Sequence, residues 1–165
     1  MNYLKGIIFI TLILVLSRII PHPPNFTPIL AGIIFLPFIK KDLTFSIIVP
    51  LAAMLISDLI IGMHSLMLWT YAPIILLSCL TYYFHQDKIM RIGNLAVASP
   101  MIFFLISNFG VWILGSSYAR DISGLMECYF NAIPFYASSA ISCLLFTALF
   151  YFLRLAFLKR NFLLN

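Results

Sequence analysis

The sequence contains very little charge. Only 9% of its 165 residues are Asp, Glu, Lys or Arg, whereas 63% are hydrophobic. Soluble domains carry about 25% charged and roughly 45–50% apolar residues, so this chain cannot build a polar surface around a core. The net charge is +5, but no basic run is longer than the pair Lys40–Lys41. These counts exclude a soluble fold and a nucleic-acid partner, and they predict a lipid bilayer as the solvent.

The sequence also lacks the motifs of catalysis and of cofactor binding. Cys79, Cys128 and Cys143 form neither a CxxC pair nor a disulfide framework. His22 and His64 have no H-x-x-H spacing and no carboxylate at ligand distance in the sequence. A nucleophile–base constellation and a phosphate loop are absent too. We therefore expect no enzyme, no cofactor and no metal site.

Apolar segments occupy most of the chain. They cover approximately residues 4–20, 27–39, 43–62, 66–84, 95–115 and 132–158. A transmembrane helix needs roughly 20 apolar residues. The pattern predicts one all-α transmembrane domain over residues 1–165, an integral membrane bundle of six transmembrane helices. The mixed stretch from Ser116 to Asn131 is expected to form a loop with a short surface helix.

The second segment is the shortest. It lies between a proline-rich stretch and Lys40, and its roughly 13 residues would make a helix of about 20 Å, less than the roughly 30 Å of a hydrocarbon core. The sequence allows a short helix shielded by its neighbours or a re-entrant segment. The distribution of charge favours a crossing, so we predict a short second helix.

The basic residues segregate between the two sides of such a bundle. Eight of the ten fall on the side of both termini, and only Arg18 and Arg120 fall on the other side. Short loops rich in Lys and Arg stay in the cytoplasm. The chain is therefore predicted to be a multi-pass protein of the bacterial cytoplasmic (inner) membrane with both termini inside.

Two charged residues lie within the apolar segments. Asp58 stands about one turn before Gly62, and Arg18 stands at the outer end of the first segment. A lone charge near the middle of a bilayer costs about 2.5–3.5 kcal/mol, so such residues are usually paired or functional. We predict a buried Arg18–Asp58 pair. A structural anchor and a direct ligand or proton role both remain open for Asp58.

Polar and aromatic residues also gather in the predicted outer loops. Three separate stretches, 18–28, 62–66 and 108–129, are expected to form the walls of one outward-facing pocket, since polar groups facing lipid would be costly. The alternative is that these groups serve only helix packing and interfacial belts. The candidate solute-binding residues are Arg18, Asn25, Asp58, His64, Asn108, Trp112 and Tyr129.

Four blocks of the sequence resemble a known family. They are residues 18–28 (RIIPHPPNFTP), residues 50–58 (PLAAMLISD) with Gly62 and His64, residues 108–112 (NFGVW), and residues 124–135 (GLMECYFNAIPF). The family is a bacterial group of small, uncharacterised multi-span membrane proteins described as transport proteins. In size and number of spans it is similar to the substrate-binding (S) components of energy-coupling-factor vitamin transporters.

The resemblance implies a function. It implies that the chain binds a small vitamin-like solute from the outer face for uptake. S components dock an energising membrane partner through small-xxx-small patterns on the first span, where this chain has Gly6 but no Ala-x-x-x-Ala. Dependence on such a partner therefore stays open. A structural or assembly protein, whose polar residues lock helices together, is the alternative.

Overall fold

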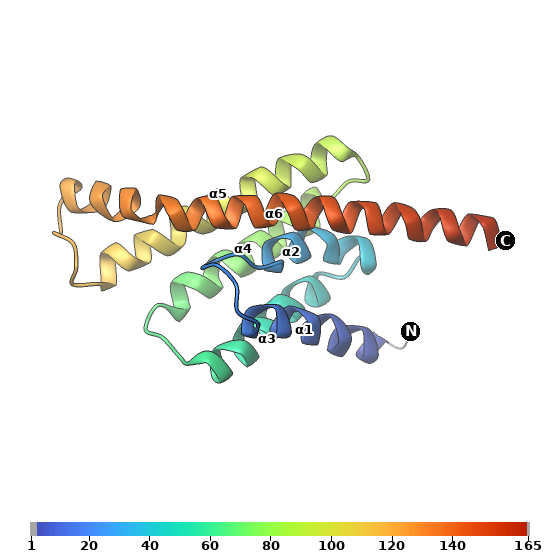
Figure 1. Cartoon of the computed structure of the whole chain (residues 1–165), viewed down its shortest axis with the longest axis horizontal. Coiled ribbons are helices and arrows are strands. Elements are labelled where there is room, and N and C mark those ends of the chain that lie inside the picture. Colours follow the sequence, from blue (N-terminus) through green and yellow to red (C-terminus); the bar gives the residue numbers. More distant parts are fainter. Residues whose placement is uncertain (1–2, 165) are drawn as a thin grey trace.

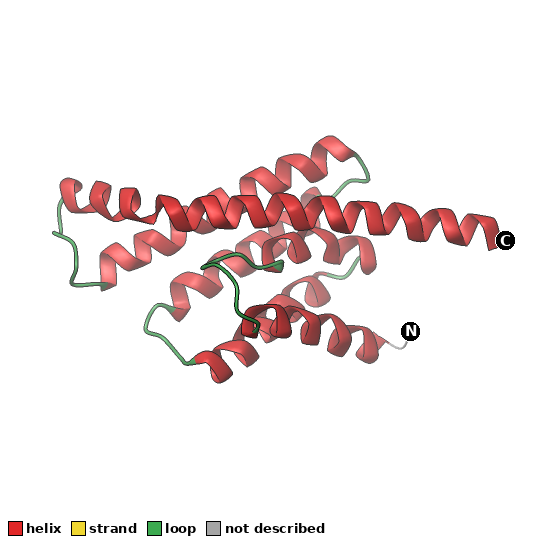
Figure 2. Cartoon of the chain, in the orientation of Figure 1, coloured by secondary structure: helices red, strands yellow, loops and turns green. Residues whose placement is uncertain are grey.

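The computed structural model is all-helical. It describes the backbone of residues 3–164, and the side chains of Lys5, residues 7–156 and Lys159. Figure 2 shows helices and loops, with no strand in the described range. In this range the six helices are α1 (Tyr3–Ile19), α2 (Ile29–Ile39), α3 (Leu43–Ile61), α4 (Met67–Phe84), α5 (Ile89–Leu114) and α6 (Ile122–Leu164).

Four of these helices have the length and composition of membrane spans. Among the described residues, α3, α4, α5 and the stretch Ile122–Ala156 of α6 are long and apolar enough to cross a bilayer, while α1 and α2 are shorter apolar helices. Large apolar side chains cover the outside of the bundle, such as Leu59, Leu68 and Phe130, which are 64%, 71% and 72% exposed. Contact with water would be unfavourable for a surface of this kind.

The short helix α2 forms the centre of the bundle. It has 11 residues, and every residue from Ile29 to Pro37 is buried. It contacts α3, α4, α5 and α6, and Ile33, Ile34 and Leu36 are the core of the apolar cluster. The prediction of a short second helix is confirmed, and its neighbours shield it from the surroundings.

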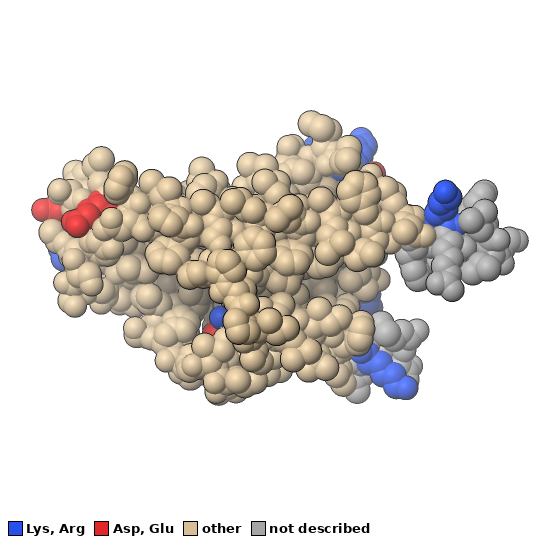
Figure 3. Space-filling model, in the orientation of Figure 1, with Lys and Arg blue, Asp and Glu red and all other residues tan. Residues whose placement is uncertain are grey.

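The chain runs back and forth between the two ends of the bundle. Figure 1 shows the start of α1 and the end of α6 at the same end, with the α3–α4 and α5–α6 connections at the other. Lys and Arg gather at the end where the termini lie, and Asp and Glu side chains are visible at the opposite end (Figure 3). The charge segregation read from the sequence therefore holds in three dimensions.

Two helix boundaries differ from the prediction. Helix α5 begins at Ile89, so Arg91 and Asn94 lie on exposed positions of its first turns and only residues 85–88 form the loop. Helix α6 begins at Ile122, so the expected separate surface helix is wrong. Asp121 caps α6 by accepting a hydrogen bond from the Gly124 amide at 2.8 Å, which starts the helix ten residues before the apolar segment.

Candidate functional site

A buried ion pair joins α1 to α3. The Arg18 guanidinium lies 2.8 Å from the Asp58 carboxylate, and the two side chains are only 18% and 3% exposed. Arg18 also donates to the Met54 carbonyl at 3.1 Å and to the Ser57 hydroxyl. The predicted pair is thus confirmed. Since removing one partner of such a pair leaves a lone charge in an apolar surrounding, the two residues depend on each other.

Helix α4 completes the shell around Asp58. The Tyr71 hydroxyl donates a 2.6 Å hydrogen bond to Oδ2 of Asp58, and Nε2 of His64 lies 3.9 Å from the same oxygen. Tyr71 stands one turn into α4 and Asp58 one turn before the end of α3, so the turn at 62–66 brings them to the same depth. Gly62 makes this turn possible, with a φ of 128° that other residues rarely adopt.

The short α2 leaves room at the end of the bundle that lies away from the termini. Helix α2 starts only at Ile29, and the nine residues before it form a loop that follows the end of α1. Prolines at positions 21, 23 and 24 stop the helix there, because proline removes a backbone donor and clashes with the preceding turn. A cavity of about 360 Å³ lies at the amino end of α2, where Thr27, Ile29 and Leu30 line it.

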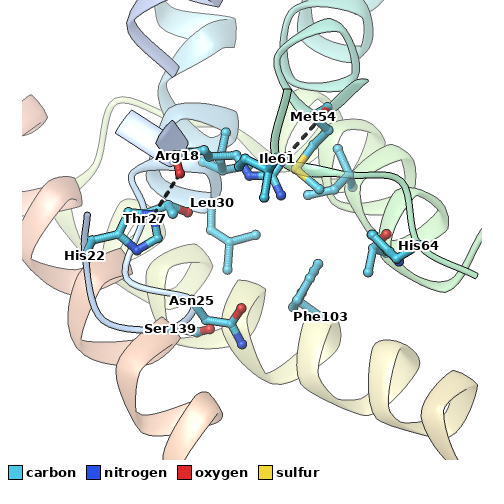
Figure 4. Close-up of a pocket in the computed structure, with 13 residues that line it drawn as sticks. Arg18, His22, Asn25, Thr27, Leu30, Met54, Ile61, His64, Phe103 and Ser139 are labelled. Carbon is cyan, nitrogen blue, oxygen red and sulfur yellow. Dashed lines mark hydrogen bonds between the residues drawn. The ribbon is translucent and has the colours of Figure 1, made fainter. Parts of the chain in front are cut away.

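Polar side chains from different helices and from two loops surround this cavity. Figure 4 shows Arg18, His22 and Asn25 on one side, with His64 and Phe103 across the space and Ser139 below Asn25. The ionisable lining residues are Arg18, His22 and His64, and the lining includes no acidic side chain. Asp58 is too deeply buried to line the cavity, so Arg18 presents the one fixed charge among the described lining residues.

A second chamber adjoins the first. Its volume is about 160 Å³, and it shares Asn25, Thr70, Phe103 and Ser139 with the larger cavity. Asn108 lines this chamber, but its amide nitrogen already donates to the Phe104 carbonyl at 2.9 Å. The two chambers share part of their lining, and the second adds the aromatic rings of Phe104, Phe135 and Tyr136 together with the polar Ser107 and Asn108.

Two of the predicted site residues lie elsewhere. Trp112 donates from Nε1 to the Ala119 carbonyl at 2.9 Å and so fastens the α5–α6 loop. The Tyr129 hydroxyl donates to the Leu105 carbonyl at 2.6 Å, which ties α6 to α5. The structure therefore brings Arg18, Asn25, Asp58 and His64 together and places Asn108 in the adjoining chamber.

The predicted walls of the pocket are correct only in part. The stretches 18–28 and 62–66 line the 360 Å³ cavity, but the stretch 108–129 contributes only Asn108 and Val111, to the second chamber. Gly110 in this stretch serves close packing, because a Cβ atom there would lie 2.1 Å from Cγ of Trp69. The small residue lets α4 and α5 approach each other.

Sequence reasoning missed Thr70 and Ser139, and it did not assign Tyr71 to the shell of Asp58. A signal existed for Tyr71, because residues equally far from a tight turn between two antiparallel helices lie at equal depth. No such signal existed for Ser139. It is one of several serines in α6, and only the packing of this helix places it at the cavity. Hydroxyl groups are common in apolar helices, and sequence does not tell which of them face a cavity.

These features define an all-helical, apolar bundle with a buried ion pair beside a polar cavity. The chain belongs to a family of unknown function (DUF6580), and the match covers residues 2–163. No curated protein and no solved structure matches the chain.

Proposed function

We propose that the chain is a six-span protein of the bacterial cytoplasmic membrane with both termini inside. Three observations support this arrangement. The outside of the bundle is apolar, α2 is shielded by its neighbours, and the exposed basic residues lie mainly at the end where the termini lie. Positively charged loops remain in the cytoplasm, so the cavity would face outward.

Cysteine labelling in intact cells tests this topology. The native Cys79, Cys128 and Cys143 are first replaced, and single cysteines are then introduced by Ser65→Cys and Lys88→Cys. An impermeant maleimide should label residue 65 from outside and should label residue 88 only after the cells are opened. Labelling of residue 88 in intact cells would place this loop outside and would contradict the proposed topology.

The function proposed for this protein is binding of a small, vitamin-like solute from the outer face for uptake, in the manner of an S component. The observation that carries it is the cavity beside the Arg18–Asp58 pair. Its volume of about 360 Å³ falls within the roughly 300–1,000 Å³ of small-molecule sites, and its lining combines apolar walls with a few polar groups. An energising membrane partner would supply the work of uptake.

A purely structural role is supported by a different observation. Asp58 is satisfied by Arg18 and Tyr71, as expected of a helix anchor. This role gives no reason for the adjoining space, because a structural core normally fills such a volume with side chains.

Filling the cavity distinguishes the two roles. Ser139 lines both chambers, so Ser139→Leu should occupy the space where they join. We expect native mass spectrometry to detect a small molecule that co-purifies with the parent protein and is lost from this variant. Ile141→Phe, at a 53% exposed position of the same helix, is the matched control and should retain the molecule.

If the parent protein carries no small molecule and none of a library of metabolites raises its melting temperature, the binding function is wrong. A Ser139→Leu variant that is more stable than the parent and keeps the bound molecule would also contradict it.

A further inference from the structure

The amino end of α2 is uncapped where it meets the cavity. Pro28 occupies the cap position and offers no side-chain acceptor, and the amides of Ile29, Leu30 and Ala31 donate no hydrogen bond to any described residue. These residues are only 3%, 8% and 0% exposed, and Ile29 and Leu30 line the cavity. Buried amides are nearly always paired, and a helix amino end carries partial positive charge, so this end is suited to an anion.

Ser139 provides a second, independent sign of a ligand. It is 5% exposed and lines both chambers, and its hydroxyl group has no hydrogen-bond partner among the described residues. The hydroxyl oxygen is open to the cavity, where a bound molecule or a water can satisfy it. In Figure 4 the side chains of Ser139 and Asn25 lie next to each other at the same border of the space.

Arg18 contributes unused donors. The contacts of its guanidinium with Asp58, Ser57 and Met54 are all made by Nη1. Within the described chain, Nη2 and Nε have no partner, although Arg18 lines the cavity. This edge of a guanidinium presents two parallel N–H groups, which match the two oxygens of a carboxylate.

The sign of the charge decides the class of solute. The ionisable groups that line the cavity are Arg18, His22 and His64, whereas the Asp58 carboxylate is held behind Arg18 and is covered by Tyr71. A cationic solute would meet the Arg18 guanidinium there and no carboxylate of the lining. A dianionic phosphate is less suited than a carboxylate, because Asp58 already neutralises the one guanidinium.

We propose that the solute is a compact organic carboxylate. Its carboxylate group accepts hydrogen bonds from the amino end of α2, from the free edge of Arg18 and from the Ser139 hydroxyl. Its apolar or aromatic body extends into the second chamber, toward Phe103, Phe104 and Tyr136. This assignment rests on the proposed solute-binding function and names the chemistry of that same site.

Matched acids and amides test the assignment. The purified full-length protein in detergent micelles is titrated by calorimetry at pH 7 with acetate, benzoate and indole-3-acetate, each beside its uncharged amide, and with inorganic phosphate. We expect at least one acid to bind ten times more tightly than its amide and more tightly than phosphate. Ser139→Ala should weaken that acid about tenfold, as expected for one hydrogen bond to a charged group. The neighbouring Ser138→Ala should not, because Ser138 does not line the cavity.

Each other outcome overturns the proposal. Equal binding of acids and amides, tighter binding of phosphate, or equal effects of the two serine variants would refute the carboxylate assignment. If none of the acids binds while another small molecule co-purifies with the protein, the carboxylate assignment fails and the binding function stands. If the protein binds no small molecule of any kind, both fail.

Discussion

Two aspartate–arginine pairs lie at opposite ends of this bundle, and they differ in their access to water. Arg18 and Asp58 meet at 2.8 Å with the aspartate 3% exposed, whereas Arg154 and Asp87 meet at 2.5 Å with the aspartate 63% exposed. The contact geometry differs as well, because Arg154 donates two hydrogen bonds to Asp87 whereas Arg18 approaches Asp58 through Nη1 alone. The surroundings differ, because the first pair adjoins the cavity inside the bundle and the second closes the α4–α5 loop against α6.

This comparison shows that the distance between the two charged groups does not by itself determine how much an ion pair contributes to stability. Exposed pairs contribute about 0–1 kcal/mol, because water competes for both charges. Breaking a buried pair by removing one partner costs about 3–5 kcal/mol, because the remaining charge is left without compensation. A buried pair can often be replaced by apolar residues at little cost, so burial alone does not make a pair stabilising.

The largest effect is expected from breaking the buried pair on one side. Asp58→Leu should destabilise the protein by about 3–5 kcal/mol, because it leaves Arg18 unpaired. The double variant Arg18→Met, Asp58→Leu should lie within about 1 kcal/mol of the parent, since it leaves no lone charge. Equilibrium unfolding in mixed micelles measures all three proteins. A double variant that is less stable than Asp58→Leu would show that the pair stabilises α1 against α3 by its own attraction.

An intermediate effect is expected from the hydroxyl that covers Asp58. Tyr71→Phe removes one hydrogen bond to a charged group and should cost about 1.5–3 kcal/mol. Tyr83→Phe is the control in the same helix, because Tyr83 is 69% exposed and its hydroxyl makes no hydrogen bond to the described residues. Its effect should stay within about 0.5 kcal/mol. Equal unfolding free energies of the two variants would mean that water replaces Tyr71 at Asp58.

The sequence predicted the pair better than the cavity. The pairing of Arg18 with Asp58 followed from depth, because each was the nearest charge that could neutralise the other. The short α2 was also predictable, from prolines on one side and Lys40 on the other. The walls of the cavity were not, because they depend on which faces of α5 and α6 turn inward. Apolar residues surround these helices on all sides, so no amphipathic pattern indicates the inward face of Ser139 or Phe103.

Helix boundaries near the ends of the bundle were hard to predict for a related reason. Residues 89–94 and 122–131 are polar enough to resemble loops, yet they extend α5 and α6 beyond the apolar segments. Helix α6 has 43 residues and so measures about 65 Å, roughly twice a hydrocarbon core. Hydropathy indicates where a helix enters lipid, whereas caps such as Asp121 decide where the helix begins.

The smallest effect is expected from the exposed pair, and its pH dependence has a definite sign. Arg154, which donates two hydrogen bonds to Asp87, lowers the pKa of that carboxyl below its ordinary value of 3.8. A lowered pKa stabilises the folded state above the ordinary value, and this contribution is lost as the pH falls through the lowered value. Asp87→Asn should therefore cost at most about 1 kcal/mol at pH 7. The guanidinium keeps its contact with the Phe38 ring at 4.7 Å, which limits the loss further.

Melting temperatures of the parent and of Asp87→Asn between pH 7 and pH 3 measure this effect. The difference between the two proteins should be constant down to about pH 5 and should shrink below the ordinary pKa of aspartate. Asp42, whose pKa is lowered mainly by the Phe45 amide, titrates in both proteins and cancels in the difference. At pH 7 the difference should also shrink in 1 M salt, because exposed charges are screened there. Two results would contradict the comparison: a loss of stability in Asp87→Asn as large as that in Asp58→Leu, or a difference that grows in acid. Either result would show that access to water does not decide how much each ion pair contributes to stability.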